Sequence, residues 1–154
     1  MSGIPAGRPA TSENLRFLIE TVQAEARHLA TTDGRLFAQA MTAARAASLT
    51  NDIDLAKRVG AFVARFGRLQ DTVADNLLPA LLDWLAEPVG PAINNLSRAE
   101  RLGWSTSADT WLELRRMQNR MIHDHVRDAE ELAYVLSRAH DTVPPLVAAA
   151  QVMA

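Results

Sequence analysis

The chain has 154 residues, of which 48% are hydrophobic, and this is enough for one domain with its own core. It contains no cysteine, which excludes disulfides, cysteine-ligated zinc and thiol catalysis, and which favours a reducing, cytoplasmic setting. The formal net charge of −2 argues against broad electrostatic binding of nucleic acid, so that any contact with RNA has to be local.

Residues 1–10 are rich in glycine and proline and are expected to form a disordered leader, followed by a single domain over residues 11–154. The leader is not hydrophobic, so it resembles neither a signal peptide nor an anchor. The longest apolar run, residues 77–85, is too short to cross a bilayer, and no association with a membrane is expected.

Apolar residues recur with helical spacing along the domain, and alanine and leucine are common while aromatic residues make up only 5%. The predicted helices cover residues 12–31, 35–48, 52–86, 92–102, 107–124 and 129–142, with an apolar tail over 146–153. Thr31–Gly34 is expected to break the chain, Pro79 to kink the long third helix, and Pro144–Pro145 to end the last one. The fold class is therefore all-α, an up-and-down bundle of about five helices.

Polar residues at the predicted helix starts are typical N-caps. They are Ser12, Asn51 or Asp52, Ser107 or Asp109, and Asp128. Gly103 is expected to close the fourth helix. Gly60 and Gly67 share one face of the third helix, and we expect them to let a neighbouring helix pack closely.

Residues 115–125, RRMQNRMIHDH, concentrate three arginines, two histidines and an asparagine within one predicted amphipathic helix. Arginine offers a rigid fork that fits phosphate, and histidine exchanges a proton near neutral pH. This combination favours binding or chemistry at a phosphodiester.

A turn of about 100° per residue sorts this helix into two faces. The predicted core stripe consists of Trp111, Leu114, Gln118, Met121, Ile122 and His125. Its polar members, Gln118 and His125, should be buried, hydrogen-bonded or at an interface. The second face carries Arg116, Asn119, Arg120 and His123.

The second face suits cleavage of RNA without a metal or another cofactor. His123 could take the proton from a ribose 2′-hydroxyl or return one to the leaving oxygen. Arg116 and Arg120 could hold the phosphate and stabilise the transition state, and Asn119 could orient the imidazole or a phosphate oxygen. Gln118 and His125 would support the site from the core side. One helix supplies only half of such a site, and two copies meeting across a dimer axis would complete it.

Two other interpretations stay open. An arginine-rich helical face is commonly a solvated surface, and a histidine near a helix C-terminus complements the helix dipole. A metal site could in principle use imidazoles or a carboxylate from His28, His123, His125, His140 and Asp124. Because His123 and His125 would point about 200° apart on a helix, a shared metal is not expected.

Three segments resemble the HEPN superfamily, and most closely its HepT-like branch, the nucleotidyltransferase-substrate-binding-like proteins. They are NLSRAERLGW over 95–104, WLELR over 111–115 and QNRMIHDH over 118–125. The resemblance spans residues 12–143 and implies an all-α, up-and-down bundle that commonly dimerises. It further implies a metal-independent ribonuclease, often a toxin, paired with a small nucleotidyltransferase antitoxin.

The motif of that family is an Arg, usually followed by Asn, then His after four to six residues, then often Tyr. Asn119 and His123 match it, whereas Gln118 stands in place of the Arg and His125 in place of the Tyr. Arg116 or Arg120 could supply the missing cation in another register. The chain is therefore interpreted as a nuclease that uses these arginines, as a degenerate module that binds RNA or a nucleotide, or as a scaffold for a nucleotidyltransferase.

Overall fold

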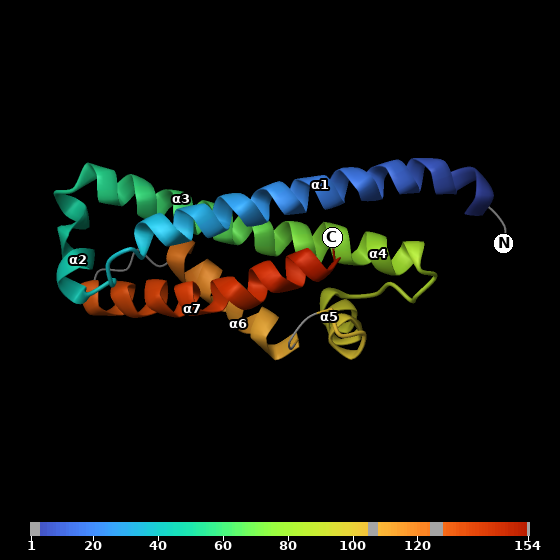
Figure 1. Cartoon of the computed structure of the whole chain (residues 1–154). Coiled ribbons are helices and arrows are strands. Elements are labelled where there is room, and N and C mark those ends of the chain that lie inside the picture. The colour runs from blue at the N-terminus through green and yellow to red at the C-terminus, as the bar shows by residue number, and fades with distance from the viewer. Residues whose placement is uncertain (1–3, 105–107, 124–127, 154) are drawn as a thin grey trace.

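The computed structural model describes residues 4–104, 108–123 and 128–153, and the side chains of 4–11 and 121–123 are not described. Within these ranges the chain is helical and has no strand, which confirms the all-α prediction. Four long rods run up and down (Figure 1). They are α1 (Ile4–Leu36), α3 (Ile53–Asp71) with its continuation, α6 (Ala108–His123) and α7 (Ala129–Met153). Both α1 and α6 pack against α3 and α7, so the four rods enclose one core.

The third rod, so named because it begins with α3 and corresponds to the third predicted helix, is continuous but changes its helical winding before Pro79. A π-helical segment, η2 (Thr72–Leu77), joins α3 to α4 (Leu78–Trp84), and the Leu78 N–H donates to the Val73 carbonyl five residues back. Proline has no N–H for an intrahelical bond, and such π turns are one way in which a helix absorbs an irregularity. The predicted kink is therefore a local π segment.

The first helix is longer than predicted at both ends. It begins at Ile4, within the stretch expected to be a disordered leader, and it continues through Thr31–Gly34, where we expected a break. Pro5 lies in the first turn, where the missing N–H costs no hydrogen bond. Farther along, Thr32 is buried and its hydroxyl donates to the His28 carbonyl at 2.8 Å, so packing outweighs the turn-like composition.

The predicted second helix, 35–48, is wrong in extent. After α1 ends, only α2 (Ala43–Ala47) and the 3-10 turn η1 (Ser48–Thr50) are helical before α3. Arg45 donates to the carbonyls of Leu36 and Gln39, each at 2.6 Å, and thereby satisfies the end of α1. Thr42 caps α2 by accepting from the Arg45 N–H.

The last helix continues past Pro144–Pro145 to Met153, although we expected it to stop there. Residues on both sides of the prolines are fully or nearly buried, including Val143, Leu146 and Ala150. Burial of these apolar residues offsets the two hydrogen bonds that the prolines cannot make.

Two of the predicted N-caps are confirmed, whereas Ser12 lies inside α1 and does not cap it. Asp52 accepts from the Leu55 N–H at 3.0 Å, and Asp128 accepts from the Glu130 N–H at 2.9 Å. Gly103 follows α5 (Ala92–Arg101) with φ +79°. Asp109 lies inside α6 instead of capping it, and Ser107 lies outside the described residues. The Glu100 carboxylate accepts from the Ala108 N–H at 2.9 Å and serves as the cap from α5.

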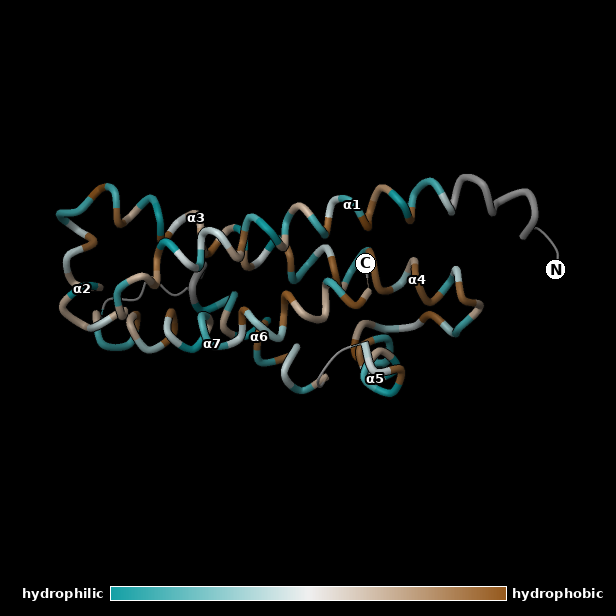
Figure 2. Tube along the Cα trace, viewed as in Figure 1, coloured by the Kyte–Doolittle hydropathy of each residue, from teal (hydrophilic) through white to brown (hydrophobic). Residues whose placement is uncertain are grey.

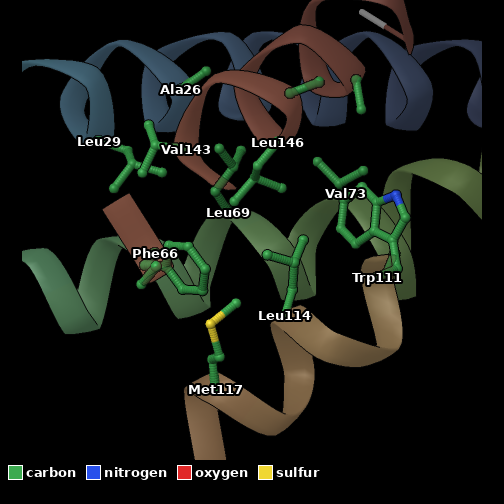
Figure 3. Packing of buried hydrophobic residues seen from close by; sticks show 14 of the residues in the cluster. Ala26, Leu29, Phe66, Leu69, Val73, Trp111, Leu114, Met117, Val143 and Leu146 are labelled. Carbon is green, nitrogen blue, oxygen red and sulfur yellow. The ribbon is translucent and has the colours of Figure 1, made fainter. Parts of the chain in front are cut away.

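Hydrophobic residues lie on the facing sides of the rods, as Figure 2 shows along the Cα trace. In Figure 3, Phe66, Leu69 and Val73 of the third rod meet Trp111 and Leu114 of α6 beneath α1 and α7. No helix in the described part of the chain is both long enough and apolar enough to cross a membrane.

Candidate functional site between α6 and α7

One side of α6 anchors the helix in the core. Trp111, Leu114 and Met117 are buried and point toward the third rod (Figure 3). Met117, which was not predicted in the core stripe, is buried, whereas Gln118, which was, is only half-buried. With this side fixed, Arg116 and Asn119 are exposed and Arg120 is half-exposed.

A shallow groove of about 220 Å³ lies between α6 and α7 on the exposed side. Its lining residues are Glu113, Arg116, Met117, Arg120, Tyr134, Val135 and Arg138. Two of the residues predicted to bind phosphate, Arg116 and Arg120, therefore lie in a concave surface. Asn119 does not line this groove.

The groove is locally basic, with three arginines and one glutamate among its lining residues, although the whole chain has a charge of −2. Arg138 donates to Glu113 at 2.6 Å, and this hydrogen bond, with the charge of Glu113, raises the pKa of Arg138. Arg120 forms an ion pair with Glu131 of α7. Arg116 has no ion pair with any residue that the structure describes. Of the three arginines that line the groove, Arg116 is therefore the most available to a ligand.

The α7 side of the groove was missed by the sequence analysis. Tyr134 and Arg138 stand four residues apart, one helical turn, and both line the groove. Tyr134 is the single tyrosine in the chain and is 62% exposed. The i, i+4 spacing of an exposed tyrosine and an arginine was visible, but nothing in the sequence indicated that α7 would pack beside this face of α6.

Gln118 faces α3 and not the groove. Its amide occupies the space beside Gly67, where an added Cβ would lie 2.7 Å from Oε1 and closer still to Cδ and Nε2. The expected close packing at Gly67 is thus present, whereas a Cβ at Gly60 would meet nothing within 4 Å. Gln118 thus packs between α6 and α3 and is half-buried, whereas the prediction placed it in the core stripe. Its Oε1 is buried and has no hydrogen-bond partner among the described residues.

Arg115, the third arginine of the motif, ties α6 to the π segment. It donates to Asp75 at 2.6 Å, away from the groove. This contact is structural, and it separates Arg115 from Arg116 and Arg120.

The two histidines of the motif are less fully described. His123 is the last residue of α6, and its side chain lies outside the described set. It follows Arg120 by three residues and Arg116 by seven, which places its Cα on the same side of the helix. His125 lies outside the described residues altogether.

The other histidines belong to separate surroundings. His140 of α7 bonds Asp33 of α1 at 2.7 Å and stacks on Phe37 with ring centroids 4.1 Å apart. His28 lines a different groove, between α1 and α3. The described residues include no group of three or more side chains placed to hold a metal ion.

No family model, curated protein or solved structure matches this chain. What the protein does must therefore be inferred from the α6–α7 groove and the side chains that line it.

Proposed function

We propose that the α6–α7 groove binds the phosphates of RNA or of a nucleotide, in a bundle of the HEPN-like type that the motif resembles. The observation that carries the proposal is the convergence of Arg116, Arg120 and Arg138 on one concave surface. Guanidinium groups bind phosphate oxygens through paired hydrogen bonds, and they keep their charge at any physiological pH.

Two features make phosphate a better fit than a carboxylate or a protein surface. The arginines are contributed by two helices, so they can contact successive phosphates instead of a single small anion. The groove is also smaller than the roughly 300–1,000 Å³ of pockets that enclose a drug-sized ligand. It therefore suits one segment of an extended ligand that lies along the surface.

A second candidate function is metal-independent cleavage of RNA, of the toxin type. Its support is the spacing of His123 behind Arg116 and Arg120 on α6, which suits proton transfer next to a bound phosphate. Gln118 stands where the family that the motif resembles has an arginine. It packs against Gly67 and is neutral. Cleavage would thus depend on Arg116 or Arg120, and binding without cleavage is the proposal that the geometry favours.

The test is binding of a short single-stranded RNA, followed by fluorescence anisotropy. Arg116→Gln should weaken binding several-fold, whereas Arg16→Gln, which removes an exposed arginine of α1 that does not line the groove, should leave it unchanged. Equal affinities for the wild type and Arg116→Gln would refute the proposal. Cleavage that persists in EDTA and is lost in His123→Ala would support the nuclease; cleavage unchanged in that variant would identify a contaminant.

The resemblance also suggests two protein partners, which we include in the proposal. One is a second copy of the chain, whose α6 would bring another His123 and further arginines to the site. The other is a small nucleotidyltransferase encoded by a neighbouring gene. A monomeric mass in light scattering, and no change on adding the neighbouring gene product, would refute both.

A further inference from the structure

From the position of Tyr134 we infer that the α6–α7 groove accepts an unpaired base as well as phosphate, so that its ligand is single-stranded RNA. This inference rests on the proposed phosphate site and names the class of its ligand. Tyr134 is 62% exposed although it lines the groove, and no hydrogen bond or ring contact is found for it within the described residues.

An exposed aromatic side chain leaves a large apolar area in water. Tyrosine contributes about 150–250 Å² when it is buried, so covering this ring with a flat partner is favourable. Its neighbours in the groove include Arg116, Arg120 and Arg138. The ligand that supplies the flat partner should therefore also carry negative charge. A nucleobase joined to phosphates meets both requirements.

The same geometry disfavours a duplex. Bases within a helix are stacked on one another, so an aromatic ring can reach a base face only where a strand is unpaired. Binding to duplex backbones relies on a wide basic surface, whereas the arginines of this groove form a local patch in a chain of net charge −2. Stacking on tyrosine is also tolerant of base identity, since every base has an aromatic face.

Three ligands of equal strand length test the inference: an eight-nucleotide RNA, an abasic chain of the same length, and an RNA duplex of two such strands. Five proteins are compared. They are the wild type, Arg116→Gln, Tyr134→Leu, Tyr134→Phe, and Phe17→Leu as the control, because Phe17 is a comparably exposed aromatic residue (65%) on α1.

Tyr134→Leu should weaken binding of the single-stranded RNA by about 5- to 150-fold, the effect of removing one stacked base. It should leave binding of the abasic chain unchanged, and Tyr134→Phe should keep nearly all the affinity. The wild type should prefer the single strand to the duplex. Variants are compared only if their circular dichroism spectra and melting temperatures match those of the wild type.

Two failures are distinguishable. If Arg116→Gln weakens the binding of both single-stranded ligands while Tyr134→Leu changes neither, or changes both equally, the stacking inference is wrong and the phosphate site stands. If the wild type binds none of the three ligands, the phosphate site and the stacking inference both fall.

Discussion

The contact between Gly67 and Gln118 predicts that Gly67→Ala lowers the free energy of unfolding in the wild type but raises it when Gln118 is replaced by alanine. A methyl group at Gly67 would overlap the Gln118 amide, so Gly67→Ala forces that side chain out of its position between α3 and α6. Overpacking of this kind costs about 1–3 kcal/mol. Replacing a helical glycine by alanine stabilises the fold by about 0.5–1 kcal/mol, because alanine loses less conformational entropy on folding than glycine does. We expect Gly67→Ala to lower the free energy of unfolding by about 1 kcal/mol, or roughly 2–4 °C in melting temperature.

In the Gln118→Ala background the overlap is gone, and Gly67→Ala should then stabilise by about 0.5–1 kcal/mol. Gly60→Ala is the matched control on the same helix, since its Cβ meets nothing within 4 Å, and it should stabilise the wild type by a similar amount. Urea unfolding of the five proteins gives each free energy. If Gly67→Ala stabilises the wild type as Gly60→Ala does, Gln118 does not occupy this interface and is free to serve the groove.

Two further predictions concern stability. Ala86 follows Leu85, the C-cap of α4, with φ +58°. Because the left-handed conformation costs a non-glycine residue about 1–2 kcal/mol, Ala86→Gly should raise the free energy of unfolding by about 0.5–1 kcal/mol; a loss measured by urea unfolding would contradict this. Burial raises the pKa of Glu25 above its ordinary 4.5, although Thr72, Arg68 and His28 lower it in part. The ionised carboxylate therefore costs stability above its folded pKa, and this cost disappears below 4.5. Glu25→Gln should stabilise the protein at pH 7 by an amount that shrinks as the pH falls toward 4.5, and a gain independent of pH would show that the charge is not responsible.

Much of the fold could be predicted from helical periodicity and capping residues. Asp52, Gly103 and Asp128 mark helix ends where the sequence analysis placed them. Two of the failures share one cause. At Thr32 and at Pro144–Pro145, local composition indicates a break, but burial against neighbouring helices keeps the chain helical. Local sequence does not report which residues a neighbouring helix will cover.

Only part of the candidate site could be predicted, because local sequence does not report which helices pack together. Arg116 and Arg120 lie on one helix, so their common face follows from their spacing. Tyr134 and Arg138 complete the groove from α7, and only the packing of α7 against α6 brings them there. The separation of Arg115, which pairs with Asp75, likewise depends on where the third rod lies.

The salt dependence of RNA binding tests the central claim most directly. If Arg116, Arg120 and Arg138 each contact a phosphate of a single strand, the logarithm of the affinity should fall with the logarithm of salt concentration with a slope of about −2, at roughly −0.7 per contact. Arg116→Gln should reduce the magnitude of that slope by about 0.7, and Arg16→Gln should not change it. A slope that is the same in the wild type and Arg116→Gln would contradict the assignment of the α6–α7 groove as a phosphate site.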